Sequence, residues 1–246
     1  MKSLKLRVVI IAGFTLLFVS QAMAWHDQTH LTIAKAAGFD KWYDCAGPDI
    51  AKIKAGNVEA YNHWFNNTAE AEITPQMVLE QIERYNQRNR IADSEGHLLG
   101  AIIASLREYE KTLQSGKYAM YHLVYCAHYI GDLSMPLHNI AHDDFNKEHH
   151  SANDGAVEAT ILNEPDKIKK QMYSIKLSDR NYEAELAREI ARIANVSRKL
   201  GYKLRAEGRD MTRQEAYVQL GHSASLLRAV LQHYNEIPAS AKEAGK

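Results

Sequence analysis

Apolar residues recur every three or four positions along most of the chain, which is the spacing of one face of an α-helix. The clearest run spans 96–113 and places these apolar residues on one face: Leu98, Leu99, Ile102, Ile103, Leu106 and Leu113. Similar patterns cover 118–133, 182–204 and 213–234, and shorter ones cover 31–37, 51–65 and 157–162. No segment alternates apolar and polar residues convincingly enough to predict a strand. The pattern therefore predicts an all-α chain.

Proline residues help to set the predicted helix limits. Thr74 and Pro75 open a helix that runs toward residue 90, because proline suits the first turn. Pro136 ends the helix over 118–133. The segment 140–153 is polar and without helical periodicity, so we expect a loop there. Since no repeat or low-complexity linker divides the chain, we expect a single-domain multi-helix bundle.

The first 24 residues have the composition of a secretory signal peptide. Three basic residues precede an apolar stretch over 8–19, which is short for a membrane span, and Ala22-Met23-Ala24 forms an A-x-A cleavage site. We therefore expect residues 1–24 to be removed after Ala24, and the domain 25–246 to begin at Trp25. The predicted location is the periplasm or the cell exterior.

Charge and cysteine content say little about the function of the chain. The chain has 30 basic and 30 acidic residues, of which the predicted signal peptide holds three basic ones and no acid, leaving 27 and 30. This balance gives no general attraction for nucleic acids. Cys45 and Cys126 would enter an oxidising compartment, where they form either a disulfide or two buried thiols.

The segment 128–138, HYIGDLSMPLH, carries the strongest candidate chemistry. His128 and Asp132 stand four residues apart, which puts both side chains on one face of a helix, and His138 follows in the turn after Pro136. Imidazole and carboxylate are good zinc ligands, and a carboxylate can bridge two ions. Taken alone, such a pair is better explained as a buried polar helix face.

The order and spacing of the candidate residues resemble those of one superfamily, the zinc-dependent phospholipases C and single-strand-specific fungal nucleases. HYIGDLSMPLH is close to that family's H-[FY]-[IL]-G-D-x-x-Q-P-[LM]-H, with Met135 where glutamine is usual. The resemblance extends from Trp25 to Asp154. It implies a secreted helical bundle with a cleft that holds three zinc ions, closer to the phospholipase C branch.

The resemblance also implies a ligand set for each ion. The first zinc would be held by Asp49, His63, His128 and Asp132. The second would be held by the free amine and carbonyl of Trp25, by His30 and by Asp132 as a bridge. The third would be held by His138, His150 and Asp154. His149 and His142 are rivals of His150, but only His150 has an acid four residues further on.

The implied activity is the hydrolysis of a phosphodiester. Two close zinc ions lower the pKa of a shared water, and the third stabilises the departing alkoxide. Asp49 would orient the attacking water or take its proton.

Spacing within the site favours a phospholipid substrate. His138 and His150 are twelve residues apart, as short as in the phospholipases, and the G-G-N segment of the longer nuclease interval is absent. We therefore expect a monomeric phospholipase C that acts at a membrane surface and releases diacylglycerol and a phosphorylated headgroup of unspecified type. One alternative is a single-strand nuclease in which Trp64 and Phe65 stack on a base. Another is a non-catalytic periplasmic helical protein.

Overall fold

The computed structural model of the chain describes residues 25–67, 71–86, 93 and 95–237, and the predicted signal peptide over 1–24 lies outside them. Every regular element in these ranges is a helix, which confirms the all-α prediction. None of the described helices is long and apolar enough to cross a membrane.

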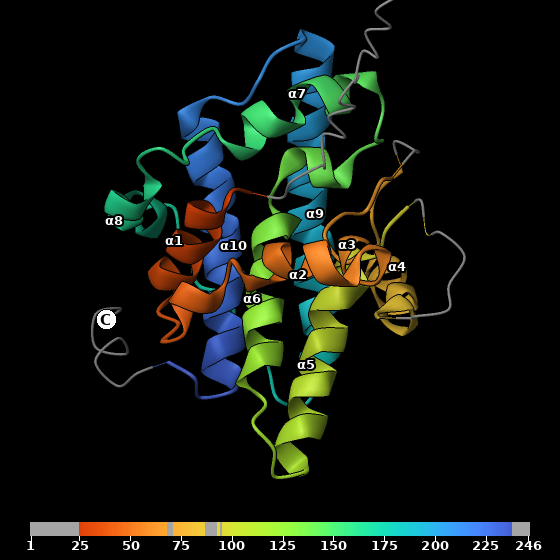
Figure 1. Cartoon of the computed structure of the whole chain (residues 1–246), viewed down its shortest axis with the longest axis vertical. Coiled ribbons are helices and arrows are strands. Elements are labelled where there is room, and N and C mark those ends of the chain that lie inside the picture. Colours follow the sequence, from red (N-terminus) through yellow and green to blue (C-terminus); the bar gives the residue numbers. More distant parts are fainter. Residues whose placement is uncertain (1–24, 68–70, 87–92, 94, 238–246) are drawn as a thin grey trace, which may run out of the picture.

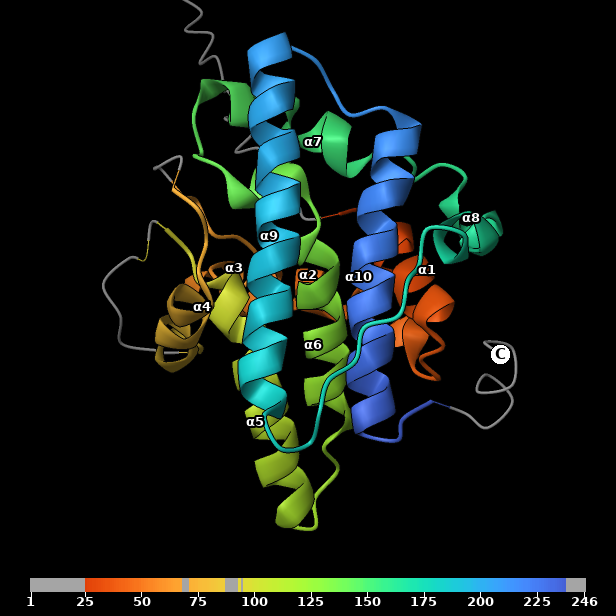
Figure 2. The same cartoon turned by 180° about the vertical axis from the view of Figure 1, so that it is seen from behind.

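Four helices run side by side along the long axis of the molecule (Figures 1 and 2). They are α5 (Leu98–Gln114), α6 (Met120–Leu133), α9 (Tyr182–Glu207) and α10 (Arg213–His233). Helix α6 contacts the other three and is buried without interruption from Cys126 to Leu133. The hydrophobic core therefore surrounds the helix that carries His128 and Asp132.

Shorter helices cover this core. Helix α1 (Asp27–Ala37) contacts α10 and α8 (Pro165–Lys169), and α4 (Pro75–Gln81) contacts α5 and α9. Helix α2 (Gly47–Ala55) contacts α6 and lies in front of it in Figure 1 and behind it in Figure 2, and α3 (Asn57–Ala60) packs beside α2. Helix α7 (Asp144–Asp154) lies at one end of the bundle. The described residues also form 3₁₀ turns at η1 (Trp42–Asp44), η2 (Ile82–Arg84), η3 (Pro136–Asn139) and η4 (Ile161–Asn163).

Two predicted helices are shorter in the structure. The predicted helix over 51–65 divides into α2 and α3, because Gly56 takes a backbone φ of 56° between them. The predicted helix from Pro75 toward residue 90 ends at Arg84, shortly before Asn86, whose φ is 52°. The segment 157–162 forms turns that lead into η4 and not a regular helix.

The predicted loop over 140–153 is wrong, because α7 occupies most of it. Its N-terminus is capped by the Asp143 side chain, which accepts a hydrogen bond from the Asn146 N–H. The buried face of α7 is polar and includes Asn146, His150 and Asp154 at intervals of four residues. A search for apolar periodicity misses a helix whose buried face is polar.

Glu158 fixes the start of α1. Its carboxylate accepts hydrogen bonds from the backbone N–H groups of Gln28 and Thr29 at 2.9 and 3.0 Å, and from the Thr29 hydroxyl at 2.8 Å. An acid at a helix N-terminus satisfies free N–H groups and complements the helix dipole. Helix α1, which carries His30, is thereby tied to the segment that follows Asp154.

The two cysteines are buried free thiols. Burial raises the pKa of the Cys126 thiol to about 12 and raises that of Cys45 further, so neither is a reactive thiolate at neutral pH. Of the two alternatives, the structure has the free thiols.

Candidate metal centre

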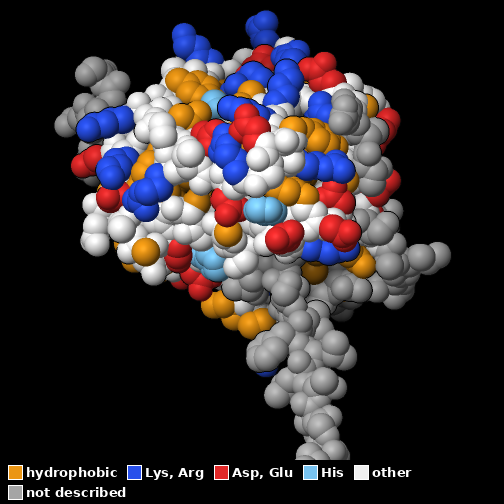
Figure 3. Space-filling view, turned by 90° about the horizontal axis from the view of Figure 1, so that it is seen from above, with side chains coloured by type: hydrophobic (Ala, Val, Ile, Leu, Met, Phe, Trp, Pro, Cys, Tyr) orange, Lys and Arg blue, Asp and Glu red, His pale blue; other side chains and the backbone are white. Residues whose placement is uncertain are grey.

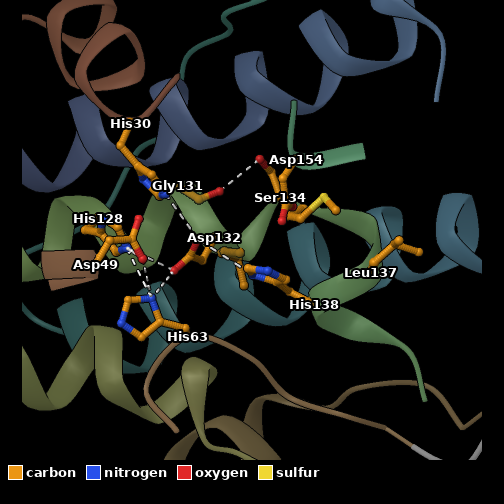
Figure 4. A network of polar contacts seen from close by, with 12 residues as sticks. His30, Asp49, His63, His128, Gly131, Asp132, Ser134, Leu137, His138 and Asp154 are labelled. Atoms are coloured by element: carbon orange, nitrogen blue, oxygen red, sulfur yellow. Dashed lines mark hydrogen bonds and ion pairs between the residues drawn. The ribbon is translucent and has the colours of Figure 1, made fainter. Parts of the chain in front are cut away.

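Eight of the nine predicted ligands are His or Asp side chains that lie close together, and seven of these are labelled in Figure 4. They come from α1, α2, α6, η3, α7 and the turn after α3. They form three groups: Asp49, His63 and His128; His30, His128 and Asp132; and His138, His150 and Asp154. Each group offers ligand atoms that lie within 4.8 Å of one another. The described residues therefore contain three buried groups of the composition and spacing that hold metal ions, as zinc sites do.

Asp132 stands between the first two groups. Its Oδ2 atom lies 2.9 Å from His63 Nδ1 and 3.4 Å from His128 Nε2. Its Oδ1 atom lies 3.3 Å from Nε2 of His30. Because each carboxylate oxygen faces a different set of nitrogens, Asp132 is oriented as a bridging ligand would be.

Asp49 completes the first group. Its Oδ1 atom lies 3.8 Å from His63 Nδ1 and 3.7 Å from His128 Nε2, and these two nitrogens are 3.2 Å apart. Asp49 comes from the first turn of α2, where Pro48 precedes it. His63 comes from the irregular segment after α3, which the broken helix makes possible.

His30 can approach α6 closely because Gly131 has no side chain. A Cβ atom at Gly131 would lie 2.5 Å from His30 Nδ1, closer than atoms can pack. The His30 ring stacks on His128 with a centroid separation of 3.7 Å. Gly131 in the HYIGD segment thus gives His30 its place beside Asp132.

The third group is formed by η3 and α7. Nε2 of His150 lies 3.2 Å from His138 Nε2 and 3.3 Å from Asp154 Oδ2. His149 points elsewhere, since its Nδ1 lies 2.7 Å from Asp210 Oδ1, and His142 is exposed.

Trp25 lies at the start of the described chain, and its side chain is buried in the core. The neighbouring His26 side chain lies about 3.3 Å from the position that a Cβ atom of Gly155 would take. The start of the predicted mature chain is therefore close to Asp154. Whether its amine is a ligand depends on cleavage after Ala24 and stays a prediction.

In three of the histidines, one ring nitrogen is hydrogen-bonded on the side away from the ligand groups, so the other ring nitrogen faces the centre. His128 Nδ1 donates to the Cys45 carbonyl at 2.7 Å. His150 Nδ1 donates to Asn146 Oδ1 at 2.7 Å, because the Asn146 amide donates to backbone carbonyls. His63 Nε2 lies 3.2 Å from Glu59 Oε1. In the neutral rings the inward nitrogens therefore carry lone pairs.

Several of these lone pairs face carboxylate oxygens that accept no hydrogen bond. The buried atoms that lack a hydrogen bond include both ring nitrogens of His30, Asp132 Oδ1, His138 Nδ1 and both Asp154 oxygens. Buried acceptors that face one another cost free energy unless a cation lies between them. The donor set thus fits bound metal ions.

The charges of the centre agree with this interpretation. Burial would raise the pKa of Asp132, but His128 and His30 hold it well below its usual range. Burial raises the pKa of Asp154 well above its usual range, Asp132 and Asp49 raise it further, and Lys52 only partly opposes them. Burial lowers the pKa of His138 well below its usual value. A cation bound in the third group would therefore favour the ionised form of the Asp154 carboxylate.

Lys52 is a residue of the centre that the sequence analysis missed. Its Nζ atom lies 2.5 Å from Asp49 Oδ1, and its side chain is only 11% exposed. Its charge opposes the upward shifts in the pKa of His128 and Asp154 and adds to the downward shift in the pKa of His138, so it acts on members of all three groups. The only signal in the sequence is its position three residues after Asp49.

The two aromatic residues predicted to contact a base differ in position. Phe65 is 6% exposed and belongs to the hydrophobic core, so the prediction that it stacks on a substrate does not fit the structure. Trp64 is half-buried and packs edge-to-face against Tyr61. Only Trp64 remains as a candidate for contact with a base.

Comparison with known protein families, with curated proteins and with solved structures finds no match for this chain.

Proposed function

We propose that this protein is a zinc-dependent phosphodiester hydrolase of the phospholipase C type. The observation that carries the proposal is the convergence of three buried His/Asp groups, with Asp132 directed at two of them. The ligands would be those of the three groups, with the amine of Trp25 added once residues 1–24 are removed. The resemblance of the HYIGDLSMPLH segment to the zinc-dependent superfamily supports zinc as the metal.

The chain's own residues fit this chemistry. When bound, the ions would activate a water molecule and neutralise the charge of the phosphodiester. Asp49 can direct that water: burial would raise its pKa, but His128, Lys52 and His63 lower it to about 2, so it stays an ionised acceptor. The Lys52 ammonium group adds a fixed positive charge that favours an anionic substrate.

Two exposed apolar side chains support a lipid substrate. Ile50 and Ile53 of α2 are 61% and 73% exposed, and they stand next to Asp49 and Lys52 on the same helix. Exposed apolar side chains one helical turn apart can enter the membrane interface. Together with the short interval between His138 and His150, they favour a glycerophospholipid, cleaved to diacylglycerol and a phosphorylated headgroup.

A single-strand nuclease is the second candidate, favoured by the position of half-buried Trp64 directly after His63. A nucleic acid also needs contacts along its backbone. At the end of the bundle seen in Figure 3, basic and acidic side chains are interspersed. That mixed surface supports the lipid more than the nucleic acid.

The test is an assay of the chain starting at Trp25, loaded with zinc, on phosphatidylcholine vesicles, phosphatidylglycerol vesicles and single-stranded DNA. We expect release of diacylglycerol that stops when a chelator removes zinc and returns when zinc is restored. Hydrolysis of DNA alone would establish the nuclease. A zinc-loaded protein that cleaves none of the three would be a non-catalytic metal-binding protein.

The role of α2 can be tested separately. Replacing both Ile50 and Ile53 by Glu should slow hydrolysis of vesicles while leaving the rate on a soluble short-chain phospholipid unchanged. Leu113→Glu is the matched control, since Leu113 is 56% exposed near the far end of α5. Equal losses on vesicles and soluble substrate would show that the isoleucines do not serve the membrane.

A further inference from the structure

Glu59 of α3 is a buried carboxylate directly behind His63. Its side chain is 5% exposed, and its Oε1 atom lies 3.2 Å from His63 Nε2. Oε1 also accepts a hydrogen bond of 2.7 Å from the Tyr129 hydroxyl, and Oε2 accepts one of 3.2 Å from the Asn62 amide. Glu59 is thus surrounded by donors, which is the condition for burying a carboxylate at low cost.

These partners determine the orientation of the His63 ring. Because Tyr129 and Asn62 both donate to Glu59, its oxygens act as acceptors, and His63 presents its N–H to them at Nε2. The lone pair of His63 is then at Nδ1, which faces Asp132 Oδ2 at 2.9 Å and His128 Nε2 at 3.2 Å. Without Glu59 either ring nitrogen could carry the proton.

A second layer of contacts holds this arrangement. Asn62 is fixed by His97, whose Nε2 lies 2.9 Å from Asn62 Oδ1, and His97 Nδ1 lies 3.0 Å from Asp93 Oδ2. The amide of Asn62 also reaches Asn86 Oδ1 at 3.2 Å. A continuous polar network therefore runs from Asp93 through buried side chains to the first ligand group.

The partner of His63 differs in charge from those of the other two fixed histidines. His128 is held by a backbone carbonyl and His150 by the amide of Asn146, both neutral acceptors. A carboxylate behind a ligating histidine fixes its tautomer and makes the imidazole a stronger ligand.

We propose, resting on the proposed metal centre, that Glu59 is a positioning residue for His63 and strengthens metal binding by the Asp49–His63–His128 group. Glu59 does not touch the metal or the substrate. It acts only through the imidazole, so its loss weakens one ion and spares the other two.

The test is zinc affinity by chelator competition in the chain starting at Trp25, comparing Glu59→Gln with the unsubstituted protein. Glutamine keeps the shape of the side chain and removes its charge. We expect one of three ions to bind about 10- to 100-fold more weakly. Imidazole ¹⁵N NMR of the metal-free proteins gives a second readout: His63 should be protonated at Nε2 in the original and a mixture of tautomers in the variant.

Asn146→Ala is the matched control, because it removes the partner of His150 and should weaken a different ion. If Glu59→Gln fails to fold, Tyr129→Phe removes one donor to Glu59 and should weaken the same ion by a smaller factor. Wild-type affinity for all three ions with an unchanged His63 tautomer would overturn the role of Glu59 and leave the proposed function standing. An unsubstituted protein that binds no zinc would overturn both.

Discussion

Oδ2 of Asp132 lies 2.9 Å from Nδ1 of His63, a residue 69 positions away in the chain. The other oxygen of the same carboxylate faces His30 at 3.3 Å. One side chain on the central helix thus joins two ligand groups that arrive from separate N-terminal segments.

Asp132→Asn should therefore remove more metal than His138→Ala. The asparagine loses the charge and one of the two oxygens that face the first and second groups, whereas His138 belongs to the third group alone. We expect elemental analysis to find one ion or fewer in the first variant and two in the second, against three in the unsubstituted protein. Equal zinc content in all three proteins would refute the bridging role.

Asp49→Asn should leave the fold intact and reduce turnover by a factor of about 100 or more, the usual scale for a group that directs proton transfer. Asparagine keeps the shape beside Lys52 and can still hydrogen-bond, but it cannot accept a proton. The measurement is the initial rate on the best substrate with circular dichroism as the check on folding. Unchanged turnover would remove Asp49 from the chemistry.

Gly131→Ala should displace His30 and loosen the second group. The added Cβ would lie 2.5 Å from His30 Nδ1, so the ring or α1 has to move. We expect loss of one ion and a decrease of about 1–3 kcal/mol in the free energy of unfolding, typical of overpacking. Gly47→Ala is the control, because a Cβ atom there meets nothing within 4 Å.

An extra residue before Trp25 should reduce zinc content by one ion and greatly lower activity. An α-amino group has a pKa of about 7.7–8.0, so zinc can displace its proton, whereas an amide nitrogen has no available lone pair. Removing the residue with a protease should restore both. If the extended protein matches the mature one in zinc and rate, Trp25 is only a core aromatic residue.

Glu215→Gln should make the free energy of unfolding less dependent on pH in the acidic range. Arg209 lowers the pKa of Glu215 to about 2 against the opposing effect of burial, and Glu215 also completes a capping box with Thr212 at the start of α10. Its folded pKa lies below the unfolded value of 4.5, so its stabilisation is present above pH 4.5 and lost as pH falls toward 2. Urea denaturation should show a cost of about 1 kcal/mol at pH 7 that shrinks at pH 3.

The long helices could be predicted because their buried faces are apolar, as in the run from Leu98 to Leu106. The same criterion fails for α7, whose buried Asn146, His150 and Asp154 are polar because they face the centre. The candidate ligands followed from spacing and resemblance. The roles of Lys52 and Glu59 could not be predicted from the sequence, because a lysine or glutamate on a short helix most often faces solvent. Only the folded chain shows which side chains lie beside them.

The ligands of the first two groups come from opposite parts of the chain. His30, Asp49 and His63 precede α4, whereas His128 and Asp132 sit on α6, so these groups exist only after the N-terminal segments have docked onto the central helix. An unfolded chain offers a metal ion little more than His-x-x-x-Asp pairs, which chelate weakly. In the proposed metal centre we therefore expect metal to bind late in folding, so that bound metal would report on a completed tertiary structure.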